Sequence, residues 1–203
     1  MQIIGLGHYS RCGKDTFANY FLDYMPGALK IPFAWKLKQI THELYAWAGL
    51  REPEYYETPE GALARDIVLP ALGLTPVQVW VKFGTPAVRE QVYDRTWIDY
   101  VLKTKHNAEV LVIPDVRFPN ECEAIKSVGG TLIKIVRPGY GPRNTVADRA
   151  LIGFNGWDYI IGAEGTMESL NMWARMFADC YKHNEYYVQS ASSRQQALSV
   201  EIL

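Results

Sequence analysis

The residues with the clearest chemical potential stand near the start of the chain, where Gly13 and Lys14 follow a short apolar run and precede an amphipathic segment. A strand, a glycine-containing loop, Gly-Lys and then a helix form the layout of a phosphate-binding loop, or P-loop. In such a loop, backbone N–H groups and the helix N-terminus hold phosphate oxygens, and the lysine reaches the outer phosphates. The pattern predicts a site for the phosphates of a nucleotide donor, formed by Arg11, Cys12, Gly13, Lys14, Asp15 and Thr16.

The match to the P-loop pattern GxxxxGK[ST] is imperfect, and an ordinary glycine turn is the alternative interpretation. Counting back from Gly13, the first glycine of the pattern falls at His8, and Gly7 comes one residue early. Asp15 takes the place of the usual serine or threonine, and Thr16 comes next. Asp15 either holds Mg²⁺, directly or through water, or caps the helix, and Thr16 contacts the ion or a phosphate. We interpret His8 as a loop residue near the phosphates and not as a catalytic base, because phosphoryl transfer depends mainly on positioning and charge.

A second group of chemical residues follows the apolar run 110–113, which is typical of a strand covered on both faces. Asp115, just past this predicted strand, resembles the acidic residue that holds Mg²⁺ in P-loop enzymes. Arg117 offers a planar guanidinium group that suits a phosphate. The alternative is that Asp115 and Arg117 form a structural ion pair. Glu121 is expected in the first turn of a helix, where the helix dipole favours a carboxylate, and not in catalysis.

The elements that must position these residues alternate between strands and helices, which predicts an α/β fold with a parallel sheet. Ligands in such sheets bind at the carboxyl ends of the strands, here the loops after Leu6 and Ile113. Residues 50–74 are not assigned, and residues 137–157 are expected to form a loop or lid. The predicted strands are 2–6, 28–32, 110–113, 131–136 and 159–161, and the predicted helices are 14–24, 34–48, 75–83, 95–105, 119–128 and 166–181.

The composition is that of an ordinary globular protein of 203 residues, with a formal net charge of −1. A dedicated duplex-DNA-binding protein usually carries a large basic excess, so stable nucleic-acid binding is not expected. The three cysteines show no disulfide framework and no zinc-ligand spacing, which is typical of reduced intracellular thiols. No run of 18 apolar residues occurs, and the N-terminus does not read as a signal peptide. These features predict a cytoplasmic protein that does not span a membrane.

Several motifs along residues 1–175 occur together in an order that resembles bacteriophage-type deoxynucleoside monophosphate kinases. The most specific are GKDT at 13–16 and DVRFPNE at 115–121, and FAWKLK at 33–38, FGT at 83–85, TWID at 96–99 and VRP at 136–138 accompany them. The resemblance implies a P-loop kinase fold, flanked by helices, that transfers the γ-phosphate of ATP to a deoxynucleoside monophosphate with Mg²⁺. It also implies a single kinase domain over residues 1–182, with a helical acceptor-binding insertion at about 35–105, a lid at about 137–157 and a polar tail at 183–203.

The resemblance also implies roles for individual residues. Those expected in catalysis are Lys14, Asp115 and Arg117, and those expected at Mg²⁺ are Asp15, Thr16 and Asp115. Those expected at the acceptor are Arg89, Arg117, Lys38, Trp80 and Phe83, and the lid cations are Arg143 and Arg149. Alternatives stay open for several of them. Lys38 could be a solvated helix lysine, the two aromatic residues could belong to the core, and the lid arginines could be solvated loop residues.

Three departures from the family pattern concern the loop, the lid and a turn. His8 replaces a glycine, the lid segment 145–149 lacks the usual Asp-His-x-Ser-Glu-like sequence, and an expected asparagine is missing from 161–165.

The leading prediction from the motifs is a (deoxy)nucleoside monophosphate kinase, with a guanine-type purine favoured as acceptor base. A P-loop kinase for another small molecule, such as a coenzyme precursor, and a non-catalytic nucleotide-binding protein are the alternatives. The expected partners are small nucleotides and, as in many family members, a second copy of the chain.

Overall fold

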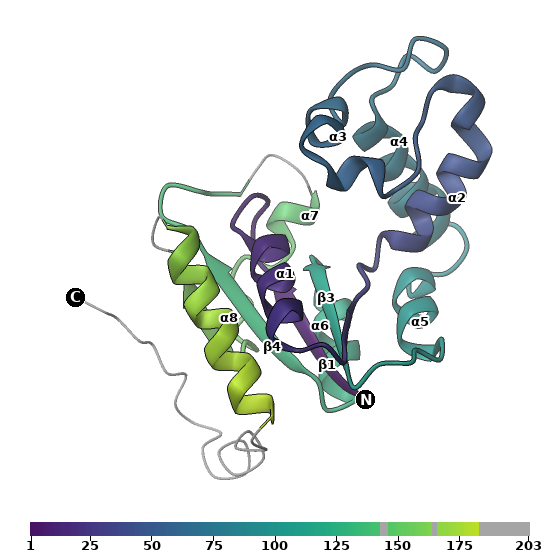
Figure 1. Cartoon of the computed structure of the whole chain (residues 1–203). Coiled ribbons are helices and arrows are strands. Elements are labelled where there is room, and N and C mark those ends of the chain that lie inside the picture. The colour runs from purple at the N-terminus through teal and green to yellow at the C-terminus, as the bar shows by residue number, and fades with distance from the viewer. Residues whose placement is uncertain (143–145, 164–165, 183–203) are drawn as a thin grey trace. The chain divides into compact units, whose positions relative to one another are not determined.

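The computed structural model describes residues 1–142, 146–163 and 166–182, and it divides the chain into two compact units (Figure 1). The first unit contains residues 1–32 and the described residues from 106 onward. The second unit contains residues 33–105, a span close to the insertion predicted at about 35–105. None of the helices in the described ranges is long and apolar enough to cross a membrane.

The first unit is built on a five-stranded parallel sheet with the strand order β2-β3-β1-β4-β5. Its central strand, β1, is buried along almost its whole length, as expected for a parallel sheet covered on both faces. The strands are β1 (Gln2–Gly7), β2 (Ala28–Lys30), β3 (Val110–Val116), β4 (Thr131–Val136) and β5 (Tyr159–Gly162). This topology confirms the predicted P-loop kinase fold, in which helices connect parallel strands.

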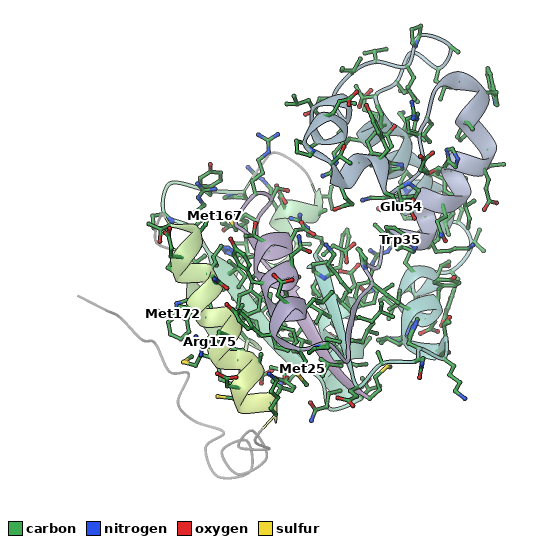
Figure 2. The ribbon with its side chains drawn as sticks, viewed as in Figure 1. Met25, Trp35, Glu54, Met167, Met172 and Arg175 are labelled. Atoms are coloured by element: carbon green, nitrogen blue, oxygen red, sulfur yellow. The ribbon has the colours of Figure 1, made fainter. Side chains whose placement is uncertain are left out.

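Helices cover both faces of this sheet, and the period of two along β1 decides which side chain meets which helix. Ile4 and Leu6 point into a core shared with Phe17 of α1 (Lys14–Tyr24) and Phe177 of α8 (Met167–Lys182). Gly5 lies between them in sequence and faces Ile125 of α6 (Pro119–Ser127) on the other side. A fourth helix, α7 (Val146–Arg149), is a single turn. The exposed side of α8 carries Met167, Met172 and Arg175 (Figure 2).

Helices joined by turns form the second unit, together with an isolated antiparallel bridge between Leu69 and Leu74. Its elements are α2 (Trp35–Tyr45), η1 (Ala46–Ala48), η2 (Tyr55–Glu57), α3 (Pro59–Ala64), α4 (Pro76–Lys82), the π-helix η3 (Phe83–Arg89) and α5 (Thr96–Lys103). Leu50, Tyr56 and Val79 form its buried centre. Thr75 begins α4 with a capping box completed by Gln78, and a proline follows at the first helical position.

Some of the predicted element boundaries are wrong, and these errors have physical reasons. The third predicted strand ended at 113, yet β3 continues through Pro114 to Val116. The missing N–H of Pro114 is tolerated because the β1–β3 register shifts at this point, between Gly5 and Gly7. The predicted helix 34–48 tightens to a 3₁₀ turn after Tyr45, and the helix predicted to end at 83 continues as η3. Within 137–157, α7 was missed because one turn is too short to show a period.

Candidate active site

The predicted P-loop connects β1 to α1, and Lys14 stands at the first position of the helix. Its side chain is buried, with 4% of the residue exposed. The ammonium group folds back over the loop and donates hydrogen bonds to the carbonyl oxygens of Tyr9, at 2.5 Å, and His8, at 3.3 Å. The loop therefore wraps around the ammonium group of its own lysine.

The backbone of the loop takes left-handed conformations at three residues, which are His8 (φ 102°), Arg11 (φ 63°) and Gly13 (φ 94°). His8 stands where the P-loop pattern has its first glycine, and it adopts a conformation that glycine enters without strain. The ring of His8 lies against Tyr9, with 3.8 Å between the ring centroids. The histidine at this position therefore holds a backbone conformation that normally favours glycine.

Gly7, which stands one residue before the expected glycine, is required by packing. A Cβ atom at this position would overlap the six-membered ring of Trp157. That ring in turn makes an edge-to-face contact with Phe154 at 5.2 Å between centroids. The indole of Trp157 thus closes over the point where β1 passes into the loop.

Burial and nearby charges change the pKa values of two loop side chains. Burial, and then the positive charge of Arg117, lower the pKa of Lys14 to about 8. Burial, and then the charge of Lys134, lower the pKa of His8 to about 4. The imidazole is consequently neutral at pH 7 and is a weak base. This agrees with the interpretation of His8 as a loop residue and not as a general base.

The end of β3 lies beside the P-loop, because Val116 pairs with Gly7 in the parallel register. Asp115 was predicted just past the strand but is its sixth residue, where it is partly exposed. Arg117 follows the strand, and its Nη1 atom donates to the carbonyl oxygen of His8 at 3.2 Å. Lys14 and Arg117 therefore meet at one carbonyl group, at the carboxyl ends of two neighbouring strands.

The acidic partner of Arg117 is Asp148 of α7, at 2.5 Å between Nη1 and Oδ1, in place of the pair with Asp115 that was the alternative interpretation. The side chain of Asp148 is 3% exposed, and the same Oδ1 accepts a hydrogen bond from Ser10 Oγ at 2.9 Å. Sequence reasoning missed this residue, because its partners are 31 and 138 positions away along the chain. Its neighbour Arg149, which was predicted as a lid cation, is exposed.

Glu121 holds the backbone that carries Arg117. Its Oε2 atom accepts hydrogen bonds from the N–H groups of Arg117, at 2.6 Å, and Phe118, at 3.0 Å. The residue is buried in the first turn of α6, as the sequence predicted. A charged acceptor for two N–H groups fixes the turn between β3 and α6, and with it the starting point of the arginine side chain.

The residues predicted to bind Mg²⁺ lie at the same end of the sheet. Asp15 is exposed in the first turn of α1, and Thr16 beside it is partly buried. The cap position belongs to Gly13 and has no side-chain hydrogen bond, so the alternative of Asp15 as helix cap is wrong. Within the described part of the chain, no three His, Cys, Asp or Glu residues gather as a metal site. Asp15 and Asp115 stay candidates for Mg²⁺, an ion that proteins often bind through one or two carboxylates together with water and substrate phosphates.

Except for Arg117, the predicted acceptor residues lie in the second unit, where Lys38 and Trp80 contact each other. Lys38 Nζ forms an ion pair with Glu57 at 3.3 Å and lies 5.2 Å from the ring centroid of Trp80. The Lys38 side chain is only 14% exposed, so it is not the solvated lysine of the alternative interpretation. Trp80 also makes an edge-to-face contact with Tyr56 at 4.9 Å, which favours a core role for this indole.

Phe83 differs from Trp80 because it lines an open cavity. The cavity has a volume of about 300 Å³ and lies wholly within the second unit. Its walls are mainly apolar and are formed by Tyr45, Leu72, Leu74, Val79, Lys82, Phe83 and Ala87. Arg89 ends the π-helix η3 and is partly buried, and Arg143 lies outside the described residues.

Comparisons with known proteins bear on the family of this chain. No protein-family model matches it. A protein of Acanthamoeba polyphaga mimivirus named as a deoxynucleotide monophosphate kinase is 31% identical over 184 residues, which cover 83% of this chain and 91% of that protein. The chain belongs to the deoxynucleotide monophosphate kinase family. The deoxynucleotide monophosphate kinase of Enterobacteria phage T4 is 30% identical over 73 residues, which cover 36% of this chain and 30% of the phage protein. Membership of this kinase family confirms both the predicted enzyme class and the viral type of the resemblance.

Proposed function

We propose that the chain transfers the γ-phosphate of ATP to a deoxynucleoside monophosphate and so forms the diphosphate. The observation that carries this proposal is the convergence of Lys14 and Arg117 on the carbonyl group of His8, beside the N-terminus of α1. Two cations and a helix N-terminus are the groups that hold and neutralise a triphosphate. The names of the mimivirus and phage relatives support the acceptor class.

In the proposed reaction, an oxygen of the acceptor phosphate attacks the γ-phosphorus atom of ATP. The bond from that phosphorus to the bridging oxygen breaks, and ADP leaves with the electron pair. The attacking oxygen is already ionised at neutral pH, so no strong base is needed. The weakly basic His8 agrees with this requirement. Catalysis then depends on alignment and on compensation of the charge that spreads over the transferred group.

The roles of the site residues follow from their surroundings. Lys14 exchanges its two carbonyl partners for oxygens of the donor phosphates, and its buried charge is strengthened there by the low local dielectric. Arg117 binds the transferred or acceptor phosphate through its guanidinium. Asp15, Thr16 and Asp115 hold Mg²⁺ mostly through water, and the ion supplies charge neutralisation when it is bound. Arg149 contributes from the lid.

For the acceptor, the cavity of the second unit supports Phe83 more than Trp80 as the aromatic contact of the base. The Trp80 ring packs against the buried core of the second unit and contacts Tyr56 and Lys38, whereas Phe83 lines the open cavity. The apolar walls suit the flat face of a purine, and Lys82 at the cavity suits its polar edge. We retain a guanine-type purine as the favoured base and Arg89 as a phosphate contact.

The test is to incubate the purified protein with ATP, Mg²⁺ and each common deoxynucleoside or nucleoside monophosphate in turn, and to follow diphosphate formation. Diphosphate from one or a few acceptors supports the proposal and identifies base and sugar. Lys14→Ala should abolish turnover in a folded protein, whereas Lys105→Ala, at an exposed lysine, should not change it. ATP binding without any product would favour another small-molecule acceptor or a non-catalytic nucleotide-binding protein, and full activity of Lys14→Ala would exclude the P-loop assignment.

A further inference from the structure

We propose that Asp148 is a positioning residue for phosphoryl transfer, which acts by fixing the guanidinium of Arg117 against the P-loop. The inference rests on the proposed function and adds to it a residue that neither the sequence motifs nor the relatives' names assign. Asp148 is the acidic residue of α7, a single turn, and it accepts hydrogen bonds from Ser10 and Arg117, which are far from it in sequence. Its buried carboxylate makes contacts that a merely solvated lid residue would not make.

The first step of the argument is that one carboxylate oxygen binds two different parts of the site. Oδ1 accepts from Arg117 Nη1 at 2.5 Å and from Ser10 Oγ at 2.9 Å. Arg117 Nη1 also donates to His8 O at 3.2 Å. The lid turn, the P-loop and the end of β3 are therefore joined at a single point by one buried, hydrogen-bonded charge pair.

The second step concerns which edge of the guanidinium is used. Both hydrogen bonds that the guanidinium of Arg117 makes to described residues leave from Nη1. The opposite edge, Nε with Nη2, keeps the two parallel donors that bind two phosphate oxygens at once. Asp148 thus holds the arginine by one nitrogen and leaves its bidentate edge for the substrate. An arginine without this anchor keeps its charge but loses its fixed direction.

The third step is the sign of the expected effect. Asp148 carries negative charge beside a site for anions, so a purely electrostatic view predicts that its removal helps phosphate binding. If Asp148 instead positions Arg117, its removal should affect kcat and the KM for ATP differently. In Asp148→Ala, the KM for ATP should not rise, while kcat should fall about 10–100-fold because an arginine displaced by about 1 Å loses its alignment with the transferred group. Damage to the fold would instead raise KM and lower the melting temperature together.

The experiment is a double-mutant cycle on kcat with Arg117→Ala, Asp148→Ala and the combination, measured with the best acceptor. If Asp148 acts through Arg117, removing it in the Arg117→Ala background should change kcat less than about 2-fold. Asp148→Asn keeps the shape and one acceptor oxygen, so it should lose less activity than Asp148→Ala and guards against simple unfolding. Val146→Ala, at an exposed position of the same turn, is the matched control and should behave as the wild type.

A full-sized loss from Asp148→Ala in the Arg117→Ala background would overturn the proposal, as would a loss from Asn as large as that from Ala. If Ser10→Ala reproduced the whole effect, the carboxylate would act through the loop hydroxyl, and the proposal would again be wrong. Failure of the proposed function looks different, because the wild type itself would phosphorylate no acceptor. The same four proteins are then compared by urea unfolding, where removal of Asp148 should cost less unfolding free energy in the Arg117→Ala background than in the wild type, and equal costs would overturn the coupling.

Discussion

His8 offers a direct test of the backbone in the P-loop, because it holds a φ of 102° where the family pattern has glycine. The comparison is between His8→Gly and His8→Ala. Both variants remove the imidazole and its 3.8 Å contact with Tyr9, so that loss cancels between them. Only the glycine variant relieves the conformational strain of the left-handed backbone at this position. The difference in unfolding free energy between the two variants therefore isolates the conformational strain at this one residue.

The magnitude follows from two opposing contributions. A left-handed conformation costs a residue with a Cβ atom roughly 1–2 kcal/mol. Glycine gives back about 0.5–1 kcal/mol, because its unfolded chain has more conformational freedom to lose. His8→Gly should therefore be more stable than His8→Ala by about 1 kcal/mol. For a chain of this length, that difference corresponds to roughly 2–4 °C in melting temperature.

The assay is thermal unfolding followed by circular dichroism, repeated as urea unfolding, with both variants at equal concentration and pH 7.5. The wild type can be included as a reference, because its imidazole, with a pKa of about 4, is neutral at that pH. An alanine variant as stable as the glycine variant, or more stable, would refute the reasoning. It would mean that the loop does not hold a left-handed residue at this position in solution.

Three further predictions concern packing, hydrogen bonding and charge. Gly7→Ala should destabilise the chain by roughly 1–3 kcal/mol in urea unfolding, because the new Cβ overlaps Trp157, and Trp157→Leu in the same chain should recover part of that loss. Glu121→Gln should cost about 1 kcal/mol, because two backbone N–H groups lose a charged acceptor, whereas Glu123→Gln on the exposed side of α6 should cost almost nothing. With a pKa of about 8, Lys14 loses its proton in the free enzyme as the pH rises through 8, while bound phosphates retain it, so the KM for ATP should rise above pH 8. A KM that stays constant between pH 7 and 9.5 would contradict the lowered pKa.

The sequence predicts the helices and strands whose residue pattern is regular. Helix Lys14–Tyr24 and strand Thr131–Val136 have the predicted boundaries, because apolar residues recur at helical spacing in the helix and β-branched residues predominate in the strand. The strand through Pro114 was cut short, since a missing N–H normally ends a strand and the register shift that tolerates it has no sequence signal. The π-helix after Lys82 was not predicted, because it too has no signal in the sequence.

The candidate site likewise contains residues that the sequence predicts and one that it does not. Lys14 and Arg117 were found because each belongs to the connection that follows a predicted strand, where a parallel sheet collects its ligand contacts. Asp148 was passed over in favour of Arg149, since a cation in a lid suits a phosphate and nothing local shows which side chain points inward. Burial decides this point, because the arginine is exposed and the aspartate is not. Long-range pairs of this kind depend on the folded chain and not on spacing.

The position of β1 has a consequence for synthesis of the protein. β1 is made first, yet it lies in the middle of the sheet between β3 and β4. All of residues 8–109 must leave the ribosome before the neighbouring strand begins, which at typical elongation rates takes roughly 5–20 s. During this interval an almost wholly apolar strand has no partner, while the compact unit of residues 33–105 can already fold as it emerges. Slow translation should therefore increase the exposure of β1 to chaperones and to aggregation, even though β1 is buried in the finished sheet.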